Sequence, residues 1–412
     1  MTPFELVAAL MTVVALAGWL NVKTLHLPNG VAMLIAGLAG AVLLFALQRL
    51  FPRFEGWREV AAYINGIDFV TTVTGYMLAF LLFAGAMQVD LAELRKRWLS
   101  ISALATLGVA GSIVVVGFGL WLIAGWLGLP LPLTWALVFG ALISPTDPVA
   151  VLATVRDGRL SKTMQVILQG EALYNDGVGI VAFTALLALA TGTGDVSPAR
   201  AVGDVFVEAL GGLFFGLAAS WAVIRLMGTL DDFVVEVALS IALAMGSYAA
   251  AQALHLSGAI AVVGAGMLFG GARAKEAVRG ETETYLVGFW TLVDEILNAL
   301  LFLLLGVEMI AVPFHAHQSG LLLAAVPLVL LSRFAVVMPW GTYYRFRHSE
   351  RRPTLILGWG GLHGALSLAL ALTIPNGPER ALILSTTYAV VAFSITVQGL
   401  TFRPLVKRIQ RD

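Results

Sequence analysis

Cysteine is absent from this chain of 412 residues, and charged residues are scarce. The lack of cysteine excludes disulfides and thiolate sites, although it says little about the compartment. Asp, Glu, Lys and Arg together make up 12% of the residues, well below the roughly 25% of a soluble globular domain. The 25 basic and 25 acidic residues cancel, so no basic surface points to nucleic acid as a partner.

Long apolar runs take up most of the chain. Hydrophobic residues make up 59% of it and the mean hydropathy is +0.90, which predicts an all-α membrane protein with many spans. The first run has no preceding basic segment and no small-residue cleavage pattern, so we interpret it as a retained span. Only Gln252 and His255 mark a boundary between the eighth and ninth runs. The thirteen candidate spans lie near 4–20, 30–47, 67–87, 99–126, 133–155, 165–190, 204–227, 233–250, 256–271, 286–312, 320–344, 354–374 and 381–402.

The positions of the basic residues test this count. Nineteen of the 25 Lys and Arg residues fall in the odd-numbered connections and the C-terminal tail, and five fall in the N-terminus and the even-numbered connections. The remaining one, Arg333, lies within a span. Because basic residues collect on the cytoplasmic side, this pattern predicts an odd number of spans, an external N-terminus and a cytoplasmic C-terminus. We expect a multi-pass protein of a bacterial inner membrane.

The chain shows no separate soluble domain, so we expect one transmembrane domain over 1–412. Its most linker-like stretch, 191–204, contains Gly192, Gly194, Ser197 and Pro198 and lies near the middle of the chain. We therefore predict a first half at 1–190, a linker with the seventh helix at 191–232, and a second half at 233–412.

The fifth candidate span is interrupted near its centre by 144–148 (Ser-Pro-Thr-Asp-Pro). The two prolines remove backbone donors and clash with the preceding turn, so the helix must unwind there. Asp147 followed by Pro148 is typical of an N-cap and a first helical residue, which would let the carboxylate hold the second half-helix. An ordinary proline kink is the alternative, but two prolines around Thr146 and Asp147 favour a broken helix.

The sixth candidate span contains a second polar group, 170–177 (Gly-Glu-Ala-Leu-Tyr-Asn-Asp-Gly). At 3.6 residues per turn, Glu171 and Asn175 share a helix face, whereas Asp176 is turned away from Asn175 by about 100°. The two carboxylates therefore point in different directions and can have different roles. A polar patch for helix packing is the alternative interpretation.

Arg333 is the only lysine or arginine deep within a candidate span. An isolated guanidinium is hard to sustain in a membrane, so we expect it to pair with a carboxylate. Glu171 is the partner we favour, which leaves Asp176 able to bind and release a ligand. The sequence leaves open three other carboxylates within spans, Asp294, Glu295 and Glu308.

The twelfth candidate span contains four glycines within 358–364 (Gly-Trp-Gly-Gly-Leu-His-Gly), which weakens a helix at its centre. The fifth and twelfth spans are seven apart and so run in opposite directions. Paired interrupted segments in two halves indicate an inverted-repeat transporter with its site at the membrane midplane. Close helix packing through small residues is the alternative for this segment.

These segments, in this order, resemble the cation:proton antiporter superfamily, in its NhaP and sodium/proton exchanger branch. The resemblance runs over most of the chain. The matching segments are 144–151, 170–176, 294–298, 306–308, Arg333 and 360–365.

The resemblance implies an NhaA/NhaP-like fold of thirteen helices with two crossed interrupted helices. It also implies a homodimer in which a mobile core moves against a dimerisation domain. Asp176 matches the family's cation and proton carrier, with Asn175 as its neighbour. Thr146 and Asp147 match the crossing of the interrupted helices, and Asp176 with Thr146 matches the Na⁺ ligands.

The resemblance further implies that Glu171 and Arg333 form an ion pair at the site. Two residues depart from the family pattern. Ala172 stands where serine is usual, and that hydroxyl can belong to the ion shell. His363 stands where arginine is usual. Because histidine titrates near neutral pH, we hypothesise that His363 modulates the pH response, with a tolerated packing substitution as the alternative.

The sequence therefore predicts a secondary transporter that exchanges a monovalent cation, most simply Na⁺, for H⁺ by alternating access, with no enzyme activity and no cofactor. Burial favours a protonated carboxyl group, so the cation and the proton would compete for Asp176. The pair Asn175-Asp176 resembles the electroneutral branch. Selectivity for K⁺ or Li⁺ and a cation channel are the alternatives. An intramembrane hydrolase would need a nucleophile or a metal-binding motif that the chain does not contain.

Overall fold

The regular structure is helical throughout the part of the chain that the computed structural model describes, which is residues 3–50, 77–89, 91–147, 160–192, 198–230, 232–271, 281–308 and 316–411. The one strand-like pairing in these ranges is an isolated bridge between Asp147 and Leu362. The all-α prediction is confirmed.

Fifteen α-helices are described, and most are rich in leucine, alanine and valine. Their bounds are α1 Pro3–Leu20, α2 Asn29–Leu50, α4 Leu78–Met87, α5 Leu91–Trp126, α6 Leu133–Ile143, α8 Lys162–Thr191, α9 Pro198–Met227, α10 Phe233–Ala253, α11 Gly258–Phe269, α13 Glu281–Glu308, α14 Ser319–His348, α15 Pro353–Gly360, α16 Ala365–Leu372, α17 Pro378–Phe393 and α18 Gly399–Arg411. Short helical turns lie at Asn21–Leu25, Ala316–Gln318 and Ser394–Gln398.

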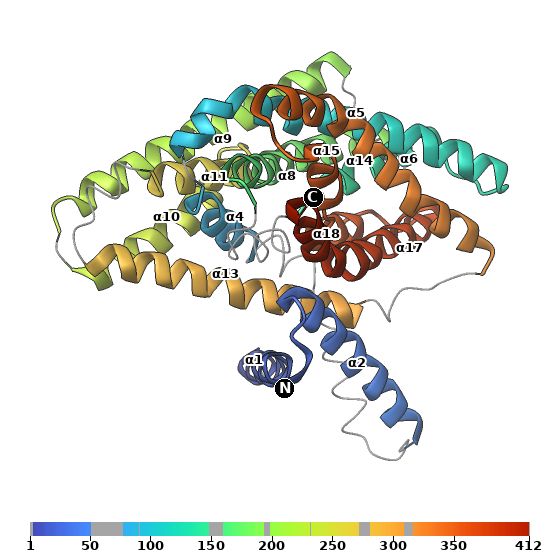
Figure 1. Cartoon of the computed structure of the whole chain (residues 1–412), viewed down its shortest axis with the longest axis horizontal. Coiled ribbons are helices and arrows are strands. Elements are labelled where there is room, and N and C mark those ends of the chain that lie inside the picture. The colour runs from blue at the N-terminus through green and yellow to red at the C-terminus, as the bar shows by residue number, and fades with distance from the viewer. Residues whose placement is uncertain are drawn as a thin grey trace.

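The helices form two groups on either side of α8, as Figure 1 shows. One group contains α9, α10 and α11, which pack on one another, and α4 packs on α11. The other group contains α5, α6, α14 and α17. The short helices α15 and α16 both contact α8, and α13 packs along α2. The polar segments of the sequence therefore lie inside the helical assembly and not at its edge.

Eight of the described helices are long and apolar enough to cross a membrane, and four shorter apolar helices accompany them. This confirms a multi-pass membrane protein. The count of thirteen spans stays a prediction, because 51–76 and 148–159 lie outside the described residues.

The boundary between the eighth and ninth candidate spans is a true helix boundary. Helix α10 ends at Ala253, and His255 adopts a left-handed backbone conformation with φ of 56°. The Ser257 side chain then accepts a hydrogen bond from the backbone N–H of Ile260 at 3.3 Å. A left-handed residue followed by a serine N-cap is a normal way to end one helix and begin the next.

Two interrupted segments cross at the centre of the molecule. Helix α6 ends at Ile143, directly before the proline segment, and residues 361–364 separate α15 from α16. The backbone N–H of Asp147 donates to the carbonyl of Leu362 at 2.6 Å. Each break thus satisfies a backbone group that the other leaves unpaired, as the interior of a membrane requires.

The predicted crossing of two interrupted helices is confirmed. The second half of the first one, 148–155, lies outside the described residues. The division into repeat halves at 1–190 and 233–412, with 191–232 between them, stays a prediction.

Candidate functional site

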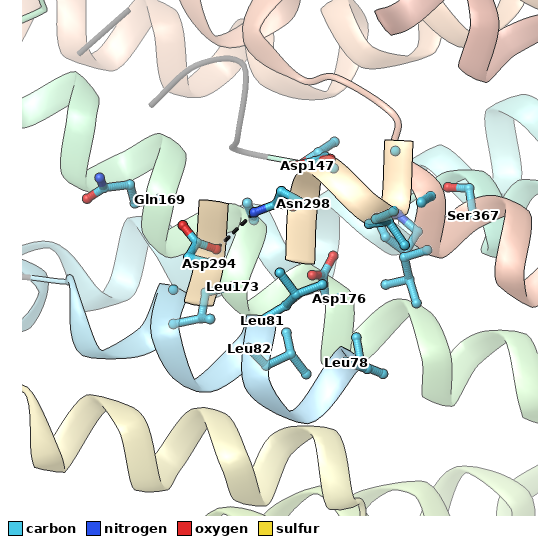
Figure 2. Close-up of a pocket in the computed structure, with 18 of the residues that line it drawn as sticks. Leu78, Leu81, Leu82, Asp147, Gln169, Leu173, Asp176, Asp294, Asn298 and Ser367 are labelled. Atoms are coloured by element: carbon cyan, nitrogen blue, oxygen red, sulfur yellow. Dashed lines mark hydrogen bonds between the residues drawn. The ribbon is translucent and has the colours of Figure 1, made fainter. Parts of the chain in front are cut away.

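A cavity of about 120 Å³ lies beside the crossing of the two breaks. Figure 2 shows leucines of α4 on one side of it, with Gln169 and Asp294 toward the left and Ser367 at the right. No lysine or arginine is among the described lining residues. Three carboxylates without a basic neighbour in the lining attract cations and repel anions. The polar residues of the lining are Gln88, Thr146, Asp147, Gln169, Asp176, Asp294, Asn298 and Ser367.

Asp176 reaches this cavity from the middle of α8. The helix begins after Ser161, whose hydroxyl accepts from the backbone N–H of Met164 at 3.2 Å, and it continues without interruption through Asp176. Asp176 is half-buried, whereas the preceding Asn175 is only 1% exposed. The turn of about 100° between neighbouring residues therefore sends Asn175 toward the break and Asp176 toward the cavity.

Asn175 holds the first break through Thr146. Its Nδ2 donates to the Thr146 Oγ1 at 2.8 Å, and its Oδ1 accepts from the Thr146 backbone N–H at 3.4 Å. Both residues are buried. Because the proline segment has lost its helical hydrogen bonds, this pair of contacts fixes Thr146 against α8. The Thr146 hydroxyl keeps a second lone pair that can face the cavity.

Asp147 lies at the crossing itself, between the two breaks. Its side chain packs against Gly364, the residue before α16, so closely that a Cβ at position 364 would lie 2.8 Å from the Asp147 Cβ. A carboxylate at the start of a helix is favoured by the helix dipole. The proposed capping of the helix after Pro148 falls outside the described residues, but the structure places Asp147 at the start of α16.

Arg333 and Glu171 form a buried ion pair between α14 and α8. The Arg333 Nη2 donates to the Glu171 Oε2 at 2.8 Å, and the Nη1 contacts the Oε1. Their side chains are 8% and 2% exposed. The rival partners lie elsewhere, because Asp294 accepts from Asn298 at 2.9 Å and Glu295 is exposed. The structure therefore has the pairing that the charge argument favoured; the side chain of Glu308 lies outside the described residues.

Arg333 also holds the end of α15. Its Nε and Nη2 both donate to the Leu357 carbonyl, at 3.2 and 3.1 Å. That carbonyl belongs to the last turn before the second break, where the helix itself supplies no donor. Gly361 makes the approach possible, since a Cβ there would collide with the Arg333 guanidinium. One arginine thus joins α8, α14 and the second break.

His363 bridges the two breaks from the other side. Its Nδ1 lies 3.2 Å from the Pro145 carbonyl, and its backbone N–H donates to the Ser394 Oγ at 2.8 Å. The ring is 4% exposed. A hydrogen bond to a carbonyl requires a proton on Nδ1, so the Pro145 carbonyl selects that tautomer. His363, the residue hypothesised to modulate the pH response, is therefore part of the crossing.

Four of the polar lining residues, Gln88, Gln169, Asn298 and Ser367, were not named as candidate site residues from the sequence. Asn298 could have been found, because it follows Asp294 by one helical turn and donates to it. Gln169 lies two residues before Glu171. Ser367 is a single hydroxyl in an apolar run, and nothing in its sequence surroundings separates it from a packing residue. Ala172 also lines the cavity.

The fold and the site together define a multi-pass membrane transporter with crossed interrupted helices beside a carboxylate in a cation-attracting cavity. The chain belongs to the sodium/hydrogen exchanger family, since the family described as "Sodium/hydrogen exchanger, transmembrane" matches residues 10–408.

Individual relatives extend over nearly the whole chain. The Na⁺/H⁺ antiporter NhaP of Pseudomonas aeruginosa is 39% identical over 412 residues, which cover 98% of this chain and 96% of the relative. The Na⁺/H⁺ antiporter NhaH of Halobacillus aidingensis is 34% identical, with the same two coverages. Among solved structures, the sodium proton antiporter MjNhaP1 of Methanocaldococcus jannaschii at pH 8 aligns with a TM-score of 0.73, 18% identity and complete coverage of both chains. This last likeness supports the fold.

Proposed function

We propose that the protein exchanges Na⁺ for H⁺ across a membrane by alternating access, with Asp176 as the shared binding group. The observation that carries the proposal is the position of Asp176, which projects into a cavity at the crossing of two broken helices. The relatives named Na⁺/H⁺ antiporters support the same exchange. The sodium/hydrogen exchangers are a family of transporters and not of enzymes.

Exchange follows from competition for one carboxylate. A carboxylate in a confined cavity can be neutralised by a proton or by a cation, and burial disfavours the bare anion. With a proton or a cation bound at Asp176, the mobile core that contains the crossing could move past the apolar surface of the dimerisation domain. The bare carboxylate would resist that movement. The protein then changes between its two orientations only with Na⁺ or H⁺ bound, and this couples the Na⁺ flux to the H⁺ flux.

The other site residues have distinct roles in this proposal. Asp176 and Thr146 are the Na⁺ ligands, and Asn175 acts by holding Thr146 in place. Asp147 adds negative charge to the cavity from the start of α16. The ion pair with Arg333 keeps the Glu171 carboxylate from binding the transported ion, and Arg333 also fixes the end of α15. His363 modulates the pH response of the crossing.

The proposal includes a membrane arrangement and an assembly. The distribution of basic residues supports an external N-terminus and a cytoplasmic C-terminus in a bacterial inner membrane. The family resemblance supports a homodimer and electroneutral exchange. No cofactor takes part, since the cation and the proton are the substrates.

The test is exchange by purified protein in proteoliposomes. An imposed pH gradient should drive ²²Na⁺ uptake by the wild type, and an imposed voltage should leave the rate unchanged if exchange is electroneutral. Asp176→Asn should abolish uptake because its amide can neither ionise nor release a proton. Glu208→Gln is the control, since it removes an exposed carboxylate of α9 outside the cavity lining. Full exchange by Asp176→Asn would refute the proposal, and Na⁺ flux without a pH gradient requirement would favour a channel.

A further inference from the structure

Ser367 is a buried hydroxyl at the wall of the cation cavity. It lies in the first turn of α16, three residues after Gly364, and its side chain is 1% exposed. The cavity lining includes it together with Thr146, Asp147 and Asp176. Figure 2 shows its side chain at the opposite side of the cavity from Asp294.

The Ser367 hydroxyl makes no hydrogen bond with any described residue. This is unusual for a hydroxyl inside a membrane helix, where the carbonyl one turn earlier is the normal partner. Several other buried hydroxyls follow the normal pattern, with Oγ to carbonyl distances of 2.7 to 3.1 Å, whereas those of Ser220 and Ser332 also lack a partner among the described residues. The examples of the normal pattern are Ser144 to Ala141, Ser385 to Leu382, Thr386 to Leu382 and Thr387 to Ile383.

A buried polar group without a partner is costly, so its retention calls for an explanation. At Ser367 the neighbouring residues suggest an explanation. Helix spacing puts Ser367 on the same face of α16 as Gly364, the residue that Asp147 packs against. Ser367 therefore shares a face of α16 with the residue that Asp147 contacts, and a small cation bound in the cavity could complete the bonding of its hydroxyl.

The described lining residues of α8 include no hydroxyl. Position 172 lies one helical turn before Asp176 and lines the cavity, but alanine there provides no oxygen. Leu173, the next lining residue of α8, provides none either. At the crossing, Thr146, Asp147 and Ser367 offer oxygen ligands to a small cation, beside the other polar lining residues Gln88, Gln169, Asp294 and Asn298.

We infer that Ser367 supplies a hydroxyl oxygen to the cation that binds at Asp176, so that α16 takes part in ion coordination. This inference rests on the proposed Na⁺/H⁺ exchange. It assigns to the second interrupted helix a ligand as well as a structural role. It also makes Ser367 a determinant of which monovalent cation is bound, because a hydroxyl oxygen is a hard ligand that suits small alkali ions.

The first test compares the Na⁺ concentration that gives half-maximal exchange in three variants. Ser367→Ala should raise it roughly three- to tenfold, with the maximal rate within about twofold of the wild type, because water can partly replace the lost ligand. Ser367→Thr keeps the hydroxyl and should stay within about twofold of the wild type. Ser220→Ala is the matched control, since Ser220 is also a fully buried hydroxyl without a partner among the described residues but lies in α9, away from the cavity.

A second variant, Ser367→Cys, distinguishes an ion ligand from a packing residue. It tests the role of Ser367 even if Ser367→Ala does not fold. Ser367→Cys replaces oxygen with softer sulfur, so half-maximal Na⁺ and Li⁺ concentrations should rise more than that of the soft ion Tl⁺. An unchanged ratio between Tl⁺ and Na⁺ would overturn the inference. So would a Ser367→Ala protein that matches Ser220→Ala.

The outcomes separate this inference from the proposed function. If the wild type shows no exchange driven by a pH gradient, the proposed function fails. If the wild type exchanges and Asp176→Asn does not, but every Ser367 variant keeps the wild-type Na⁺ dependence and selectivity, only the inference about Ser367 fails.

Discussion

The two breaks that cross at the centre of this protein are made by different residues and held by different partners. The first is opened by Pro145, and its Thr146 is held by the amide of Asn175 on α8. The second lies among glycines, and the last turn before it is held by the charged side chain of Arg333. The first break contributes a carboxylate to the cavity, whereas the second contributes space and, by our inference, a hydroxyl.

This difference shows how a membrane protein can keep two unwound segments side by side. At the proline break, the amide of Asn175 accepts from the Thr146 backbone N–H and donates to the Thr146 hydroxyl, so one neutral side chain serves as both acceptor and donor. The glycine break leaves a carbonyl unpaired, and a guanidinium with several donors can satisfy it. Both partners depend on α8, which carries Asn175 and also Glu171, the counter-ion of Arg333. Asp176, on the same helix, is left for the transported ion.

The largest effect is expected when the support of the second break is removed. Glu171→Gln leaves the Arg333 guanidinium buried without a counter-charge, which should cost about 3–5 kcal/mol of stability. Thermal unfolding of the detergent-solubilised protein measures the loss. The double variant Glu171→Gln with Arg333→Gln should regain part of it, because no buried charge remains. A single variant as stable as the wild type would show that the pair does not support the break.

The space at the second break provides the next test. Gly364→Ala would place a Cβ against the Asp147 side chain, and such overpacking should cost about 1–3 kcal/mol and reduce exchange. Gly246→Ala in α10 is the matched control, because a Cβ there meets nothing within 4 Å. The two variants are compared by thermal unfolding and by the exchange rate. Equal behaviour would contradict the close contact of Asp147 with Gly364.

The neutral support of the first break should be weaker than the charged one. Asn175→Ala leaves Thr146 without both contacts and should cost about 1–3 kcal/mol, with a raised half-maximal Na⁺ concentration. A double-mutant cycle with Thr146→Val in the exchange assay measures the coupling between the two side chains. Additive effects would mean that Asn175 acts on the ion independently of Thr146.

The smallest effect is expected where the two breaks are joined by His363. Gln at this position keeps a donor for the Pro145 carbonyl but does not titrate. The maximal exchange rate of His363→Gln should therefore stay within about twofold of the wild type, while the pH of half-maximal exchange shifts measurably, by up to about one unit. An unchanged pH profile would leave His363 with a structural role alone.

Much of this arrangement could be predicted from the sequence because its causes are local. Proline and glycine indicate the two helix breaks from the local sequence alone. An arginine within a span requires a carboxylate as its partner. The partners across the breaks were harder to predict. The contact between Asn175 and Thr146 joins residues 29 positions apart, and the placement of Asp147 at the start of α16 depends on how two distant segments cross. Ser367 was missed because a lone serine in a helix is usually satisfied by its own backbone.

The most direct test of the central claim is the dependence of Na⁺ affinity on pH in the wild type. If Na⁺ and H⁺ compete for Asp176, the half-maximal Na⁺ concentration should rise about tenfold for each unit of acidification once the site is mostly protonated, and saturating Na⁺ should restore the same maximal rate. The measurement is initial ²²Na⁺ uptake into proteoliposomes over a series of pH values. A half-maximal concentration that does not change with pH, together with a maximal rate that falls, would contradict a shared carboxylate.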